Sequence, residues 1–492
     1  MDQDRHTYKR VRLLTGVLTP LVLSAALLAL AHFRDAAWEP GLQVAGICRE
    51  LIAGTTEGRQ ALVGSCWSAP LPVLFYLPFA WLLSEPYAGW TAFFAVWLFV
   101  FWAVREAVKS TGHSAGRIIL AQAAIAAMAV AVRQPQALQI TVALAVGLAL
   151  LTGAGLADWV ACRRVRDVVS AGAAGAFLAL CGFSVLGPAV CAVAALPFAA
   201  CGDRETRARF KAWTLLGWLP LAYAMAVWLL MNRLVLGDSL FFLRSLAHVA
   251  PNALLFGAAL LLPAAALLPA LFATWACDGR HELPGAGRGP SLFVLISFAV
   301  ALLANVYVLN AFGVGWESAT LHLCLLAVLM VALARIQLTP AVLSLPLAAF
   351  VCLSAFLFRG EKGATEVCDP NREAVCRDVE AYVNEQTPYG RVFVLGYAGL
   401  DLLRGYAGDR LEPNMDLHVG SLRRAYKGQV LYVLVPKPVG QTRAESVFWR
   451  FPDIYELGGE RLLFAAAFGT WHLFQVVTAP TQEQLDEWKR AR

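Results

Sequence analysis

Charged residues are scarce in this chain of 492 residues. Asp, Glu, Lys and Arg make up 15% of it, whereas soluble domains carry about a quarter, and 59% of the residues are hydrophobic. This composition excludes an ordinary soluble protein and predicts a polytopic membrane protein in contact with a lipid bilayer. The first apolar run, Leu13 to Phe33, reaches the roughly 20 residues of a transmembrane helix and is too long for a signal-peptide core.

Several chemical signals are also absent. No Cys-x-x-Cys or Cys/His spacing of a metal site occurs, so the sequence names no cofactor and leaves a divalent metal open. The apolar stretches carry essentially no ionisable residue near their midpoints, where coupled transporters place the groups that move ions or protons. A channel or a transporter is therefore disfavoured.

The apolar stretches predict about eleven spans in a polytopic all-α membrane domain that covers residues 1–358. We place them near 12–33, 88–105, 117–133, 138–158, 168–185, 187–201, 212–232, 252–276, 291–311, 318–334 and 341–358. Arg-rich loops and turn residues such as Gly187-Pro188 separate them. The region 168–201 is either a hairpin or one kinked pair, which leaves the count open by one or two.

The Lys and Arg residues of the short loops give the orientation, because they are enriched on the cytoplasmic side. Seventeen lie on one side, in the segments 5–12, 105–117, 163–166, 204–211 and 280–288 and at Arg335. Six lie on the other side before residue 359: Arg34, Arg49, Arg59, Arg133, Arg233 and Arg244. We therefore predict a multi-pass protein of the bacterial inner membrane with a cytoplasmic N-terminus. The net charge of +6 then requires no nucleic-acid partner.

The first outer loop, residues 34–88, is long and acidic. Its carboxylates are Asp35, Glu39, Glu50, Glu57 and Glu85, and we predict a helix from Leu42 to Leu51. The apolar run from Pro70 to Leu83 has about 14 residues, which is short for a span. If it crossed the membrane, the basic segment 105–117 would lie outside, so we predict a juxtamembrane helix at the interface.

The composition changes after residue 358, where charges become frequent. Alternating apolar residues predict strands at 391–395 and 429–435, and a helix at 373–385 precedes them. A hairpin is predicted from 461–466 and 470–477, joined across Phe468-Gly469. Residues 359–492 are therefore expected to form a small extracytoplasmic α/β domain.

Four of the eleven cysteines fall on the predicted outer side, where disulfides are stable. We predict a bridge between Cys368 and Cys376, which are close in sequence, and a second between Cys48 and Cys66. Four free thiols are the alternative. The other seven cysteines are interpreted as packing residues.

The order of these features resembles the GT-C glycosyltransferases. A first span, an acidic outer loop with a helix, and Trp67-Ser-Ala-Pro-Leu-Pro before a short apolar helix are similar to the protein mannosyltransferase and aminoarabinose transferase branch. The segments Asn232 to Arg244 and Tyr382 to Ala398 are similar to patterns in bacterial members that lack an assigned function. The resemblance covers the whole topology, although each motif is loose.

The resemblance implies a sugar donor linked to polyprenyl phosphate and an acceptor glycan, lipid or protein on the outer face. It also implies a catalytic carboxylate in the first outer loop, and Asp35 and Glu39 are the candidates. Glu39-Pro40 stands where the family has Asp, often Asp-Glu, which is a departure. Basic residues near the membrane surface bind the donor phosphate in the family, and the candidates here are Arg133, Arg233 and Arg244. Asp238, His248 and Glu50 are further candidate site residues.

Ordinary structural roles stand beside each of these assignments. Asp35 and Glu39 flank Trp38, and such residues are common at membrane surfaces without any catalytic role. Arg133 is equally consistent with a side chain that extends from a span end to the interface. Asp238 and Arg244 fit a helix cap, and Glu50, Glu57 and Glu85 fit solvated loop charges. A catalytically inactive scaffold or a lipid-carrier-binding subunit is therefore the alternative function.

Overall fold

The computed structural model describes residues 13–34, 42–109, 115–131, 139–198, 210–244, 289–311, 318–357 and 372–477. Short gaps within these ranges fall at 66, 68–69, 163, 243, 337–339 and 388, and at 404–405, 407, 416, 418–421, 423–425, 427–428, 440–441, 444 and 460. The chain divides into two compact units. Unit 1 comprises residues 1–41, 66–239 and 250–362, and unit 2 comprises 42–65, 240–249 and 363–492.

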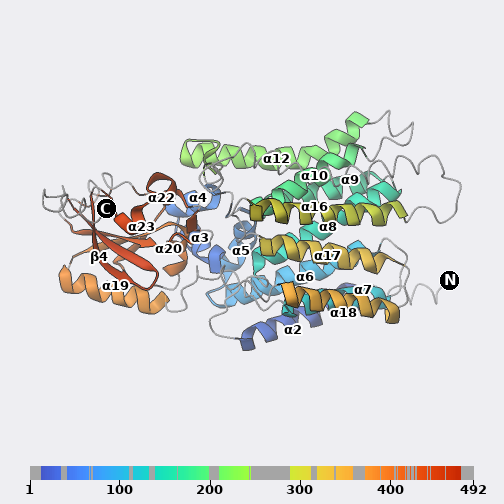
Figure 1. Cartoon of the computed structure of the whole chain (residues 1–492), viewed down its shortest axis with the longest axis horizontal. Helices are drawn as coiled ribbons and strands as arrows, with labels where there is room; N and C mark the ends of the chain where they lie inside the picture. The colour runs from blue at the N-terminus through green and yellow to red at the C-terminus, as the bar shows by residue number, and fades with distance from the viewer. Residues whose placement is uncertain are drawn as a thin grey trace. The chain divides into compact units, whose positions relative to one another are not determined.

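Unit 1 is a bundle of helices that lie side by side (Figure 1). It begins with a short π-helix, η1 (Leu14–Leu18), which continues into α2 (Thr19–Arg34). The other described helices are α5 (Pro70–Leu82), α6 (Tyr87–Lys109), α7 (Ala115–Ala131), α8 (Ile140–Cys162), α9 (Val165–Ala179), α10 (Phe183–Phe198), α12 (Phe210–Leu236), α16 (Gly289–Ala311), α17 (Ser318–Arg335) and α18 (Pro340–Leu357).

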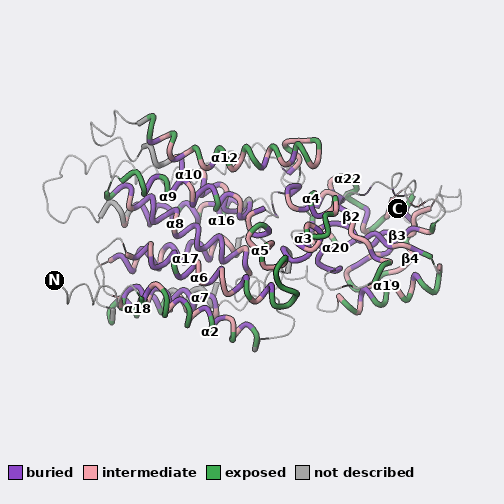
Figure 2. The backbone as a smooth tube through the Cα atoms, turned by 180° about the vertical axis from the view of Figure 1, so that it is seen from behind, coloured by how far each residue is buried: buried purple, intermediate pink, exposed green. Residues whose placement is uncertain are grey.

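Five of the described helical segments are long and apolar enough to cross a membrane: Leu14–His32, Tyr87–Lys109, Ile140–Cys162, Lys211–Leu236 and Val294–Ala311. Shorter apolar helices lie between them. Helix α8 is buried along almost its whole length, whereas few residues of α12 are buried and the others are exposed or half-buried (Figure 2). An exposed apolar helix surface of this length fits lipid rather than water, so the protein is a multi-pass membrane protein.

Ten of the eleven predicted spans correspond to described helices. The remaining one, 252–276, lies outside the described residues. The predicted break at Gly187-Pro188 is wrong, because Pro188 lies within α10. The chain turns instead at 180–182, where Leu180 and Cys181 donate to the carbonyls of Phe177 and Leu178 at 3.1 and 3.0 Å. Helices α9 and α10 pack against each other as a hairpin, which resolves the alternative left open for 168–201.

Buried polar residues join helix ends at one end of unit 1. Arg335 of α17 forms an ion pair with Asp158 of α8 at 3.0 Å and donates to the carbonyl of Ala107 in α6 at 2.8 Å. Arg117 of α7 lies 3.5 Å from the carbonyl of Ile336. The distribution of Lys and Arg in the loops places Arg105, Arg117 and Arg335 on one side of the membrane. The packing agrees with this, because Arg117 and Arg335 lie at the same end of the bundle.

Unit 2 is built around a five-stranded sheet of the described residues. The strands are β1 (Arg391–Leu395), β2 (Leu411–Asn414), β3 (Leu431–Pro436), β4 (Leu462–Phe468) and β5 (Trp471–Val476), in the order β2-β1-β3-β5-β4. Strand β1 is parallel to β2 and β3, and β5 is antiparallel to β3 and β4. The hairpin turn between β4 and β5 uses Gly469 at φ 58°, a conformation that glycine adopts without strain.

Alternate residues of the sheet fill two separate cores. Val392 and Val394 face α19 (Arg372–Gln386) and α20 (Gly396–Leu402), whereas Phe393 and Leu395 face the side of α22 (Ser446–Arg450) and α23 (Ile454–Leu457). The predicted helix, both strands and the hairpin of this domain are therefore confirmed. The sequence did not predict β2, α20, α22 or α23.

Unit 2 also contains two helices from the first loop. Helix α3 (Leu42–Ile52) confirms the predicted helix, and α4 (Thr56–Val63) was not predicted. Helix α5 has nearly the predicted bounds, and its position relative to a membrane remains a prediction. The grouping of 42–65 with the C-terminal residues was not predicted from the sequence.

Candidate functional site

Several predicted site residues cannot be placed. Asp35, Glu39, Arg133 and His248 lie outside the described residues, as do Cys66 and Cys368. Their proposed roles therefore remain predictions. Glu50, Arg233, Asp238, Arg244, Cys48 and Cys376 are described.

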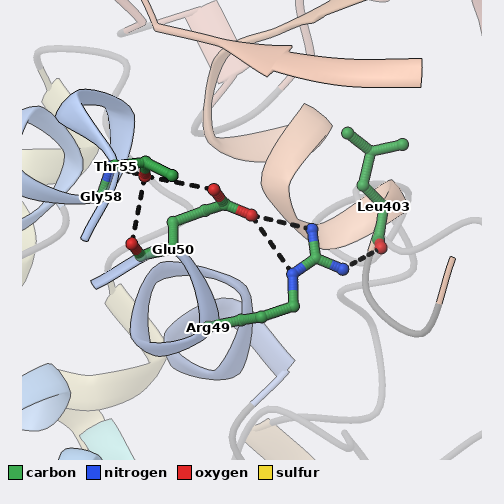
Figure 3. Close-up of polar contacts among 5 residues, drawn as sticks. All are labelled: Arg49, Glu50, Thr55, Gly58 and Leu403. Atoms are coloured by element: carbon green, nitrogen blue, oxygen red, sulfur yellow. Dashed lines mark hydrogen bonds and ion pairs between the residues drawn. The ribbon is translucent and has the colours of Figure 1, made fainter. Parts of the chain in front are cut away.

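Glu50 joins the end of α3 to the start of α4 (Figure 3). Its Oε1 pairs with Arg49 Nη2 at 3.0 Å, and its Oε2 lies 3.1 Å from the hydroxyl of Thr55. Thr55 is the N-cap of α4, and its hydroxyl accepts from the N–H of Gly58 at 3.1 Å. With 7% of its surface exposed, Glu50 is not the solvated loop charge that was expected. Because its carboxylate has two partners within the loop, these contacts give Glu50 a structural role.

Helices α3 and α4 are held against α20 by contacts to backbone atoms. Arg49 Nη1 donates to the carbonyl of Leu403, directly after α20 (Figure 3). The hydroxyl of Tyr397 in α20 donates to the carbonyl of Ala61 in α4 at 2.9 Å. At Gly46 a Cβ atom would lie 2.6 Å from the carbonyl oxygen of Leu400, so only glycine allows α3 to approach α20 this closely.

The first turn of α20 contacts a buried carboxyl group. Glu445 Oε1 accepts from the N–H of Ala398 at 3.1 Å, and Oε2 has no hydrogen-bond partner among the described residues. Burial raises the pKa of Glu445 to about 8, and the N–H groups of Ala398 and Tyr397 oppose that rise because they favour the charged form. Gly396, at φ 74°, makes room for this carboxyl group, since a Cβ there would lie 1.5 Å from Oε2.

The residues of this contact escaped the sequence analysis for different reasons. Gly396 directly follows the buried strand β1, and a glycine at the carboxyl end of a strand is a signal that was available. Glu445 and Gly46 had no such signal, because their partners are about fifty and several hundred residues away in the chain.

The predicted phosphate-binding arginines that are described lie at or after the end of α12. Arg233 is exposed, and its Nη1 donates to the carbonyl of Gly237. Gly237 follows the last residue of α12 and has a φ of 74°. Arg244 is exposed and lies over the ring of Phe241 at 5.7 Å, and Phe241 contacts Trp449 at 5.5 Å. Asp238, between them, is partly buried. Arg233 belongs to unit 1 and Arg244 to unit 2.

The predicted disulfides involve cysteines that are only partly described. Cys48 is buried in α3, and its predicted partner Cys66 lies outside the described residues. Cys376 carries a free thiol in this structure, which lies 3.7 Å from the carbonyl of Leu402, and burial raises its pKa to about 11. Because Cys368 is not described, this pairing also remains a prediction. Among the described residues, no cluster of three or more His, Cys, Asp or Glu side chains could hold a metal ion.

No protein-family model matches the sequence, and no curated protein matches it significantly. Among solved structures, the chain is similar to the crystal structure of ArnT from Cupriavidus metallidurans in the apo state, with a TM-score of 0.38 and 14% sequence identity. That alignment covers 92% of this chain and 97% of the other. A similarity at this level does not assign a function.

The class of protein follows from the structure itself. The chain is a multi-pass membrane protein with a helical unit and a small α/β unit that also includes the helices of the first loop.

Proposed function

We propose that the protein is a membrane glycosyltransferase of the GT-C type. It transfers a sugar from a polyprenyl-phosphate donor to an acceptor on the outer face of the inner membrane. The observation that carries the proposal is the order of elements after the first span. Helix α3 and the short apolar helix α5 precede the next long span, α6, as the sequence resemblance implies, and α4 lies between α3 and α5.

The proposed reaction is a single displacement with inversion at the anomeric carbon. A first-loop carboxylate, Asp35 or Glu39, takes the proton of the acceptor hydroxyl while the oxygen of that hydroxyl forms a bond to the anomeric carbon. The bond from the anomeric carbon to the phosphate oxygen breaks, and the polyprenyl phosphate leaves with the electron pair. Guanidinium groups stabilise the leaving phosphate, and Arg133, Arg233 and Arg244 are the candidates.

Substitution of the carboxylates tests this assignment. Asp35→Asn and Glu39→Gln keep the shape of each side chain and remove its ability to accept a proton, which typically lowers the rate by about 10²- to 10⁴-fold. We would measure transfer from a polyprenyl-phosphate donor fraction labelled in the sugar, and binding of polyprenyl monophosphate. Donor binding should survive these changes, whereas Arg→Ala at a phosphate-binding position should weaken it.

The controls and the contrary outcome are direct. Glu85→Gln, an exposed carboxylate of the same loop, should leave transfer unchanged. A double variant of Asp35 and Glu39 as active as the parent would remove the first loop from the mechanism. The alternative, a non-catalytic subunit that binds a lipid carrier, is favoured by Glu39-Pro40 at the position where the family has Asp. It predicts donor binding by the parent protein without transfer.

A further inference from the structure

We propose that α20 is the element that positions the first-loop helices for the transfer reaction, with Gly46 and Tyr397 as positioning residues. This inference rests on the proposed function. Helix α20 follows directly on strand β1, which pairs with both β2 and β3, and the carboxyl group of Glu445 contacts its first turn. The start of α20 is therefore anchored to the sheet of unit 2.

The contacts between α20 and the first loop are suited to fix geometry. They involve the middle of α3 at Gly46, the last turn of α3 at Arg49 and α4 at Ala61. In each case at least one partner is a backbone carbonyl, whose position does not change with side-chain rotamers. Contacts at three separate points restrict both the translation and the rotation of a helix pair.

The two first-loop helices are also rigidly joined to each other. The carboxylate of Glu50 connects Arg49 to the N-cap residue Thr55. Where the helices meet, a Cβ atom at Gly58 would lie 2.6 Å from the backbone carbon of Glu50. The pair should therefore move as one body, and a shift at its contact with α20 would move the whole of α3.

Short stretches of chain join the proposed catalytic carboxylates to α3. Glu39 precedes Leu42, the first residue of α3, by three residues, and Asp35 precedes it by seven. We therefore expect activity to depend more on the position of α3 if Glu39 is the base.

Two substitutions in the full-length protein test the role of α20. Gly46→Ala places a methyl group against Leu400 and must separate α3 from α20. A displacement near 1 Å in a remote contact can lower a rate by roughly 10²-fold, so we expect a fall in kcat of about 10- to 100-fold. Tyr397→Phe removes the hydroxyl that donates to the carbonyl of Ala61, and we expect a fall of about 2- to 10-fold.

Each substitution has a matched control within unit 2. Tyr382→Phe also removes a hydroxyl that donates to a backbone carbonyl, that of Ala465 at 3.2 Å, but this bond joins α19 to β4. Gly459→Ala adds a methyl group whose nearest neighbour, in Leu462, would lie at an ordinary 3.7 Å. Both controls should keep the parental kcat.

Three measurements separate positioning from general stability. Hydrogen exchange of the α3 and α4 amides should accelerate in Gly46→Ala and Tyr397→Phe, and not in the controls. The Kd for polyprenyl monophosphate and the Tm should change little in all four variants. Two outcomes would overturn the inference and leave the proposed function intact. One is faster exchange in Gly46→Ala and Tyr397→Phe with an unchanged kcat, and the other is unchanged exchange in these variants. An inactive parent would contradict the proposed function, while the exchange data would still show whether α20 holds the helices.

Discussion

Glu445 offers a sharp test of the energetics of unit 2. Its carboxyl group is 6% exposed, and one of its oxygens has no hydrogen-bond partner among the described residues. Burial raises its pKa from 4.5 to about 8. The folded state therefore keeps the proton over a pH range in which the unfolded chain has released it. The contribution of this group to stability is complete below pH 4.5, declines as the pH rises, and is lost above about pH 8.

The size of the effect follows from the same values. The interval from 4.5 to about 8, at 1.36 kcal/mol for each pH unit, sets an upper limit of roughly 5 kcal/mol. Glu445→Gln should remove this dependence, because an amide keeps the shape and does not ionise. The variant should have a stability within about 1 kcal/mol of the parent at pH 5 and should be more stable by about 2–5 kcal/mol at pH 8.5.

Hydrogen exchange of the β1 and β3 amides, corrected for the intrinsic pH dependence of exchange, would measure the local free energy of opening. Glu456→Gln, an exposed carboxyl in α23, serves as the control and should follow the parent at every pH. If the opening free energies of the parent and of Glu445→Gln decline in parallel from pH 5 to 8.5, the argument from burial is wrong.

Three further predictions concern single residues. Arg335→Met removes the ion-pair partner of Asp158, whose side chain is 24% exposed, so denaturation in detergent should show a loss of about 1–3 kcal/mol. Gly396→Ala combines an unfavourable φ of 74° with a collision against Glu445, and the same assay should show a loss of about 2–5 kcal/mol. If Cys368 and Cys376 form the predicted bridge, it should stabilise by roughly 2–3 kcal/mol, and mass mapping that finds both thiols alkylated without reductant would exclude it.

The elements that the sequence predicted are those whose pattern is local. Alternation in 391–395 and the glycine at the tip of the hairpin carry their own signal, and the structure has these elements at nearly the predicted positions. The predicted turn at Gly187-Pro188 was wrong for a related reason. Proline interrupts a helix in water-soluble proteins, but an apolar helix packed among others tolerates it, and the turn formed at 180–182 instead.

The contacts of the first loop could not be read in this way. Gly46 contacts Leu400, and Tyr397 contacts Ala61, across more than three hundred residues of chain. Neither residue has a local pattern that indicates a partner so distant. Glu50 shows a different difficulty, since its partners Arg49 and Thr55 are close to it in the sequence, but its burial, with 7% of its surface exposed, depends on the fold. Burial and partner identity are properties of the tertiary structure.

The composition of unit 2 bears on how the chain crosses the membrane. Residues 42–65 and 240–249 pack in one unit, so both must lie on the same side, and the chain between them must cross an even number of times. The described helices between them are α5, α6, α7, α8, α9, α10 and α12. The predicted spans leave out α5 and take the other six as crossings, which is an even number. Counting α5 as a crossing would make the number odd.

Helix α5 is therefore expected to lie along the interface, and two exposed positions on either side of it test this. Thr56→Cys lies before α5 and Ser84→Cys lies after it, and both positions are exposed. An impermeant thiol reagent added to intact cells should label both variants above the level of the parent. The same reagent should label Lys211→Cys, at the predicted cytoplasmic end of α12, only after the cells are opened. Labelling of Thr56→Cys alone would mean that α5 crosses, and the grouping of the three segments in unit 2 would then be wrong.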